Sequence, residues 1–198
     1  FYKPEREYQD ALCNTLQAAY EKRILSEKTG KPIKYLIINL PPGFGKSYTL
    51  ANFANWCYGK DYKNKIITVS YNNTIAPEFA RTTRDMILEE PDPEGDSYTT
   101  RDFFPDVRVK YGDASVMKWS LEGSYASYLA TSFDGTVTGM RGNIIIIDDP
   151  IKNDKEAAND AVKEGHWNYL KNTLSSRALP GALWIVVLTR WATDDLAG

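Results

Sequence analysis

The stretch LIINLPPGFGKSYTLANF, residues Leu36–Phe53, decides the fold of this chain. It opens with an apolar run of strand length, passes two prolines and reaches a glycine-rich turn at residues 43–47. Apolar residues then recur at Leu50, Phe53, Ala54 and Cys57, which is the spacing of an amphipathic helix. A glycine-rich turn between a strand and a helix, closed by a lysine and a hydroxyl residue, is typical of a phosphate-binding loop.

Each residue type in this turn has a chemical reason. Glycines let the main chain wrap so that its N–H groups point at phosphate, and a lysine reaches the terminal phosphates. The Ser47 hydroxyl is expected to bind Mg²⁺. The usual spacing is Gly-x4-Gly-Lys-[Ser/Thr], but Leu40 stands at the first glycine position, so this loop is a variant. A plain turn with a solvated lysine is the alternative. The predicted nucleotide-binding residues here are Pro42, Gly43, Phe44, Gly45, Lys46, Ser47 and Tyr48.

The composition is that of an ordinary globular protein. Of 198 residues, 42% are hydrophobic and 25% are charged, and the net charge of −2 is not that of a protein that coats DNA. No apolar run approaches the ~20 residues of a membrane helix, so we expect no membrane association. Two cysteines are too few for a disulfide scaffold or a zinc site, and they fit a reducing, intracellular setting.

Buried strands alternate with helices along the chain. We predict strands over 34–40, 65–71, 143–150 and 182–191, helices over 4–24, 47–58, 74–90 and from Asn153 to near Ser176, and a hairpin within 114–133. The run 34–40 reads as a strand buried on both faces. Such alternation predicts an α/β fold with a mostly parallel sheet flanked by helices, and therefore a P-loop NTPase core.

A pair of aspartates, Asp148 and Asp149, follows four isoleucines at 144–147 and is the second candidate nucleotide feature. Asp148 is expected to hold Mg²⁺ through water near Ser47, and Asp149 to orient the attacking water. Many ATPases have glutamate at the second position, and Asp149 is one methylene shorter. The alternative is a turn cap, because aspartate before proline often starts a turn. Residues 43–47, 148–149 and 189–190 all fall at strand carboxyl ends, where ligands of parallel sheets bind.

Five segments together resemble the large terminase subunit of tailed bacteriophages, the motor ATPase that packages viral DNA. They are REYQ (6–9), NLPPGFGKS (39–47), VSYNNTIAPEFARTTRDMI (69–87), GTVTGMRGNIIIIDDPIKN (135–153) and VVLTRWATDDLAG (186–198). The last two resemble the Walker B region with its glycine-rich approach and the coupling motif, and are the most specific.

The resemblance implies further residue roles. Gln9 would read the adenine base. Thr189 would end a strand between the two nucleotide strands, the place of a γ-phosphate sensor in ASCE-type ATPases. Gly43 and Phe44 occupy the stretch where many terminases carry a loop arginine or histidine, which directs attention to Arg141 as an arginine finger acting on a neighbouring subunit. The rival arginines are Arg101, Arg108 and Arg190.

The resemblance also implies cofactors, partners and a domain layout. ATP and Mg²⁺ would be bound, and the partners would be double-stranded DNA, the portal protein and the small terminase subunit. We expect a homo-oligomeric ring when assembled, a monomer in isolation, and a location in the host cytoplasm. Residues 1–198 would form the amino-terminal ATPase domain, lacking its last elements, with no nuclease domain in this chain. The DNA-contact candidates are residues 60–65, Arg81 and Arg84.

Three other functions remain open from the sequence. One is a P-loop kinase, although no acceptor-binding or lid pattern is evident. A helicase-like DNA translocase shares the nucleotide core, although it would need a second ATPase-like lobe. A nucleotide-gated assembly module that hydrolyses little ATP is favoured modestly by Leu40 and by Asp149 in place of glutamate.

Overall fold

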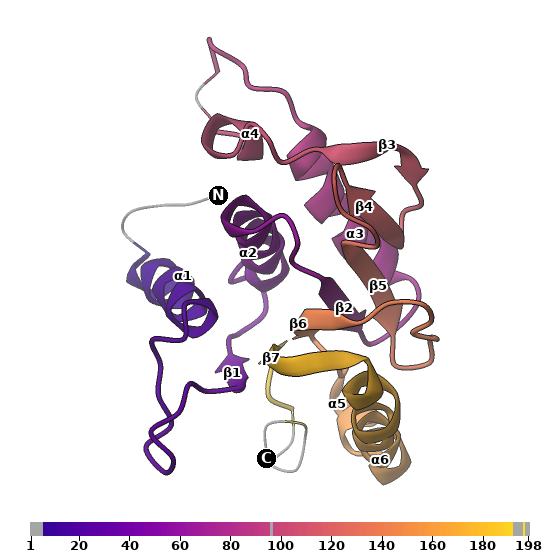
Figure 1. Cartoon of the computed structure of the whole chain (residues 1–198). Coiled ribbons are helices and arrows are strands. Elements are labelled where there is room, and N and C mark those ends of the chain that lie inside the picture. Colours follow the sequence, from indigo (N-terminus) through magenta and orange to yellow (C-terminus); the bar gives the residue numbers. More distant parts are fainter. Residues whose placement is uncertain (1–5, 96, 192–195, 197–198) are drawn as a thin grey trace.

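In the part of the chain that the structure describes, a seven-stranded sheet lies between two layers of helices (Figure 1). The computed structural model describes residues 6–95, 97–191 and 196. The strand order is β1-β7-β6-β2-β5-β4-β3. The first five strands in this order, β1, β7, β6, β2 and β5, are parallel to one another. Strands β4 and β3 extend the sheet as antiparallel strands. The predicted α/β class with a mostly parallel sheet is confirmed.

The elements alternate in the expected order. The strands are β1 (Tyr35–Asn39), β2 (Ile66–Ser70), β3 (Val109–Ala114), β4 (Lys118–Leu121), β5 (Tyr128–Ser132), β6 (Gly142–Asp148) and β7 (Ala178–Leu188). The helices are α1 (Glu7–Tyr20), α2 (Lys46–Lys60), α3 (Ile75–Leu88), α4 (Thr100–Phe103), α5 (Asp154–Ala157) and α6 (Asp160–Asn168).

Alternate residues of the central strands enter two separate cores. Ile66, Ile144 and Ile185 belong to the core beneath α1, α2 and α3, whereas Ile145 and Trp184 belong to the core on the opposite face. Figure 1 shows α1 and α2 on one side of the sheet and α5 and α6 on the other. The continuous isoleucine run of β6 follows from this, because a strand covered on both faces needs apolar residues at every position.

Strand β1 departs from the prediction. It was expected to be buried on both faces, but it is the edge strand, and Tyr35 and Ile37 are 66% and 46% exposed. Leu36 and Ile38 point to the other face and pack against the core under α1 and α2. An apolar run cannot distinguish an edge strand from a central one, because strand order depends on contacts far apart in sequence.

The helix predicted from Asn153 to near Ser176 is wrong as a single element. Asn153 caps its start, since its Oδ1 accepts from the Glu156 N–H at 3.0 Å. The helix breaks after α5, and Asn159 caps α6 by accepting from the Ala161 N–H at 3.1 Å. A π-helical turn (Tyr169–Leu174) and a 3₁₀ turn (Ser175–Arg177) complete the segment. Asparagine side chains compete with the helical backbone for hydrogen bonds, which explains the break.

The hairpin around Glu122-Gly123 is confirmed as the antiparallel pair β4 and β5. Strand β3 and the short helix α4 were not predicted, because apolar residues in 100–114 follow neither the helical nor the strand period clearly. Residues 4 and 5 of the first predicted helix lie outside the described residues. Helix α1 (Glu7–Tyr20) confirms the middle of that prediction, but it ends four residues earlier than the predicted residue 24. No helix within 6–95 or 97–191 is both long and apolar enough to cross a membrane.

Candidate nucleotide-binding site

The carboxyl ends of three adjacent parallel strands build the site. Strand β7 lies between β1 and β6, with Leu188 opposite Asn39 and Val187 opposite Asp148. Two further ladder bonds follow these pairs, from the Leu40 N–H to the Leu188 carbonyl at 3.2 Å and from the Asp149 N–H to the Val187 carbonyl at 2.8 Å. The expected position of the Thr189 strand between the other two is therefore confirmed.

The phosphate-loop segment has the backbone that its glycines predict. Gly43 and Gly45 have φ of 80° and 73°, a left-handed conformation that glycine adopts readily, and α2 begins directly afterwards at Lys46. Pro42 and Phe44 lie exposed in the turn between β1 and α2. Leu40 is not among the described residues with positive φ, so the first loop position does not require glycine. Its side chain packs against the core instead.

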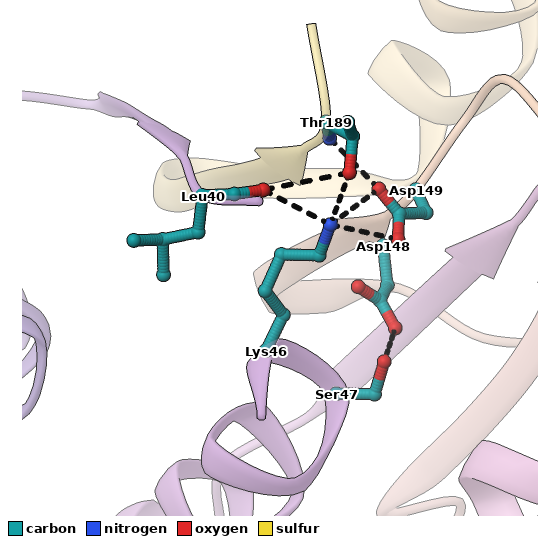
Figure 2. Close-up of polar contacts among 6 residues, drawn as sticks. All are labelled: Leu40, Lys46, Ser47, Asp148, Asp149 and Thr189. Carbon is teal, nitrogen blue, oxygen red and sulfur yellow. Dashed lines mark hydrogen bonds and ion pairs between the residues drawn. The ribbon is translucent and has the colours of Figure 1, made fainter. Parts of the chain in front are cut away.

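The Lys46 ammonium lies at the centre of the site (Figure 2). Its Nζ donates to the Leu40 carbonyl at 3.2 Å, to the Thr189 hydroxyl at 2.6 Å and to Asp149 Oδ1 at 3.0 Å. The lysine is only 6% exposed, so three acceptors replace the water that a buried ammonium loses. These residues come from three loops and are up to 149 positions apart in the chain.

Asp149 holds Lys46 and Thr189 together. Its φ of 43° lies in the left-handed region, which aspartate tolerates better than most residues. Its Oδ1 also accepts from the Thr189 N–H at 2.9 Å, so one carboxylate oxygen contacts both the lysine and the main chain after β7. The contact between Asp149 and Lys46 was not anticipated from the sequence, nor was the acceptor role of the Leu40 carbonyl.

Ser47 and Asp148 form the second polar pair. The Ser47 hydroxyl donates to Asp148 Oδ2 at 2.5 Å, while the buried Asp148 Oδ1 has no hydrogen-bond partner among the described residues. Burial raises the pKa of this carboxyl to about 6, and Asp149 adds to the effect, against the opposing influence of Ser47 and Lys46. A hydroxyl beside a carboxylate with a spare oxygen supplies the hard oxygen ligands that Mg²⁺ prefers, so the residues fit this ion.

A cavity of about 340 Å³ opens next to this pair. Its lining includes Ser47, Asp148 and Tyr48, together with Glu78 and Thr82 of α3. No cluster of three or more acidic, histidine or cysteine side chains that could hold a metal occurs among the described residues. Neither Glu78 nor Thr82 carried a signal in the sequence, because only the fold places α3 beside Ser47.

Helix α1 reaches the loop from the other side. The Tyr8 ring lies 4.9 Å from the Phe44 ring, centroid to centroid. Gln9, the next residue, is 2% exposed, and neither its Nε2 nor its Oε1 has a partner within the described part of the chain. A buried, unpaired amide is costly, so this side chain is a good candidate for a group that bonds a ligand.

Arg141 lies far from these residues. It directly precedes β6, whereas Asp148 ends the same strand, and seven residues of extended chain span about 23 Å. Arg141 is exposed and cannot reach the site of its own chain. Of its rivals, Arg101 donates to the Ile87 carbonyl and pairs with Glu90. Arg108 is exposed near Pro105, and Arg190 directly follows Thr189.

Fold and site together define an α/β domain of the ASCE type, with a phosphate-loop segment and an acidic strand end on either side of the β7 terminus. A family model described as "Terminase large subunit, T4likevirus-type, N-terminal" matches residues 37–196. The chain therefore belongs to the terminase large subunit family, and it corresponds to the amino-terminal ATPase region. Positions 192–195 and 197–198 of the coupling-motif segment lie outside the described residues.

One solved structure with the same fold is the large terminase of bacteriophage HK97. The two share 15% sequence identity with a TM-score of 0.51, and the match covers 93% of this chain and 39% of the HK97 chain. At this identity the comparison supports the fold alone. No curated protein sequence matches the chain significantly.

Proposed function

We propose that this chain binds ATP with Mg²⁺, hydrolyses the ATP, and uses the reaction to drive double-stranded DNA into a viral procapsid. The observation that carries the proposal is the position of the Lys46 ammonium, held by Leu40, Asp149 and Thr189 at the ends of three adjacent strands. In the family these loops would be the phosphate loop, the Walker B region and the coupling motif.

Nucleotide binding would use both sides of the loop. The N–H groups around Gly43 and Gly45 and the amino terminus of α2 would hold phosphate oxygens. Lys46 would turn from Asp149 toward the β and γ phosphates. Gln9 would bond the adenine base from α1, where its amide now has no partner among the described residues.

Ser47 and Asp148 would hold the metal, Ser47 directly and Asp148 through water. Bound Mg²⁺ would neutralise charge on the phosphates and help to position them. The Asp148 carboxyl must be ionised for this role. Because burial raises its pKa to about 6, the site would lose metal affinity as the pH falls below that value.

Hydrolysis would rely on Asp149 and on a neighbouring subunit. Once Lys46 leaves it, Asp149 would accept a hydrogen bond from the attacking water and orient it toward the γ phosphate. Arg141 of the adjacent copy would stabilise charge on the transferring group, as an arginine finger does. Thr189 contacts both Lys46 and Asp149, so it would respond to the loss of the γ phosphate.

Assembly follows from the family. The proposed partners are the portal protein, the small terminase subunit, double-stranded DNA and further copies of this chain in a ring. A finger that acts in trans requires a head-to-tail contact between copies, and such contacts form a ring where the rotation between copies closes.

A nucleotide-gated assembly module is the second candidate, and one observation favours it. Asp149 is short and already engaged by Lys46 and the Thr189 N–H. A carboxylate held in this way would support binding and slow turnover.

Phosphate release, measured with and without duplex DNA, tests the proposal. The native chain should turn over ATP faster with DNA, and Lys46→Ala should abolish turnover and weaken nucleotide binding. Lys155→Ala, at an exposed lysine of α5, is the matched control. Bound nucleotide without turnover at high protein concentration would support the gated module instead. Unchanged turnover by Lys46→Ala would overturn both candidates.

A further inference from the structure

The parallel sheet has a second edge, opposite the candidate nucleotide site. Strands β1, β7, β6, β2 and β5 all begin at this edge, which we call the amino edge. A row of basic residues precedes these strands or lies beside their first residues. It consists of Lys22, Lys31, Lys34, Lys63, Lys65 and Lys118, which we call the amino-edge row. Arg141 lies at the same edge but is kept for the proposed finger.

The register places the row across the sheet. Leu183 lies opposite Ile144, and Ile144 lies opposite Ile66. Tyr35 lies opposite Trp184, so Lys34 is level with this line of residues and Lys65 stands one residue before it. Three strand spacings separate them, or about 14 Å. Both are fixed by main-chain bonds, since the Lys34 carbonyl accepts from Trp184 at 2.7 Å and the Lys65 carbonyl accepts from Asn143 at 3.0 Å.

Tyr125 gathers two of the lysines at the β2 and β5 end of the row. The Lys65 Nζ donates to the Tyr125 carbonyl, and the Lys118 Nζ lies 6.0 Å from the centre of its ring. Lys118 also approaches the Arg141 loop, because a Cβ at Gly139 would lie 3.7 Å from its Nζ. The ammonium groups of Lys65 and Lys118 therefore both lie at Tyr125, and Lys118 lies beside the loop that carries Arg141.

A cavity of about 590 Å³ lies at the other end of the row. Lys22, Lys31 and Lys34 line it, with Asn64 and Asn143 at its inner wall. Asp61 also lines it, and Glu122 lies in the β4–β5 turn, so the edge is not free of acidic groups. Nevertheless, no member of the amino-edge row forms an ion pair with a carboxylate of the described residues.

We propose that the amino-edge row binds the phosphate backbone of duplex DNA. An extended row of mostly exposed lysines fits a polyanion whose charges repeat along its length better than one small anion, which would need convergent groups. Lysine contacts to phosphate carry no base information, and a motor that moves along any sequence requires this property. The inference deepens the proposed function by assigning its DNA partner to a surface away from the triphosphate.

Direct binding of a 30-base-pair duplex of mixed sequence tests this surface. Fluorescence anisotropy between 50 and 200 mM salt gives both affinity and salt dependence. The variant Lys34→Gln/Lys65→Gln/Lys118→Gln should bind about tenfold or more weakly, and the slope of log K against log salt should fall by about 2 to 3. Arg141 is left unchanged because the proposed finger uses it.

The matched control removes three exposed lysines elsewhere, as Lys152→Gln/Lys155→Gln/Lys171→Gln, for the same change in net charge. It should keep the native slope. If the first variant folds poorly, Lys22→Gln/Lys31→Gln/Lys34→Gln alters exposed residues only and carries the same expectation. If the row variants keep the native slope of log K against log salt, or if the control loses as much affinity as they do, the amino-edge row is not the DNA-binding surface. Either result leaves the proposed DNA partner itself untouched. A native chain that binds ATP but no duplex overturns the DNA partner as well.

Discussion

Lys46 and Asp149 form an ion pair at 3.0 Å across 103 positions of sequence, with the lysine buried and the aspartate half-buried. Each therefore neutralises the other at the point where a nucleotide would carry its terminal phosphates. The pair joins the proposed phosphate-binding lysine to the proposed water-orienting carboxylate. Nucleotide binding and activation of Asp149 are thus expected to be one event.

Asp149→Asn should separate binding from chemistry. The amide keeps an oxygen for the Thr189 N–H but loses the charge that holds Lys46, so nucleotide affinity should stay the same or rise. Turnover should fall about 100-fold or more, as expected on removal of a general base. Isothermal titration and phosphate release provide the two measurements, with Asp154→Asn as the exposed control. Native-like turnover would remove Asp149 from the mechanism.

Asp148→Asn should stabilise the nucleotide-free protein in a pH-dependent way. The folded-state pKa is raised from about 3.8 to about 6 by burial, so the neutral form is favoured in the folded chain. The stability associated with that form is fully present below pH 4 and is lost as the pH rises through 6. At pH 8 the free energy of unfolding of the variant should therefore be higher by ~2 kcal/mol, and its melting temperature higher by a few degrees. At pH 4 the gain should be smaller.

Thermal unfolding of both proteins at the two pH values is the measurement for Asp148. The same variant should lose Mg²⁺-dependent nucleotide binding at either pH. A difference in melting temperature that does not change with pH would show that burial of this carboxylate does not cost folding free energy.

Thr189→Val should uncouple the sensor without removing the strand. Valine has nearly the same shape but cannot accept the 2.6 Å hydrogen bond from Lys46, while the Thr189 main-chain N–H still contacts Asp149. We expect turnover and its stimulation by DNA to fall about tenfold, with nucleotide affinity changed little. Thr189→Ser should restore both. Loss of nucleotide binding alone would assign this hydroxyl to ground-state binding.

Gln9→Leu should have two opposite effects. The free energy of unfolding without nucleotide should rise by ~1 kcal/mol or more, since a buried amide with no partner in the described chain is removed. The preference for ATP over GTP should disappear. Melting curves with and without each nucleotide test both, with Gln17→Leu on the same helix as control. A retained preference would exclude Gln9 as the base reader.

Arg141→Ala should act in trans. Arg141 precedes the strand that Asp148 ends and cannot reach its own site, so the finger must come from a neighbouring copy. The variant by itself should show no turnover, because every site then lacks its finger. Mixing it with Asp149→Ala should restore part of the activity, since some interfaces then pair an intact finger with an intact site. Phosphate release from the mixture, compared with each variant alone, is the measurement. No restoration at any mixing ratio would count against the trans finger.

The local elements could be predicted closely because their signals are local. The helix predicted over 47–58 is α2 (Lys46–Lys60), and the strand predicted over 65–71 is β2 (Ile66–Ser70). The long helix after Asn153 was predicted wrongly because Asn159 could not be recognised as a second cap within a helical pattern. Strand β1 looked central because an apolar run reports hydrophobicity and not strand order.

The sequence by itself determined which groups could bind a nucleotide: two glycines able to adopt positive φ, a lysine and a serine at a helix start, and an aspartate pair after a buried strand. These depend on residue type and short-range spacing. Only the tertiary structure decided that Lys46 pairs with Asp149, that Gln9 is buried without a described partner, and that seven cationic residues share the opposite edge. Those relationships join residues distant in sequence, and they exist only once the parallel sheet sets its strand order.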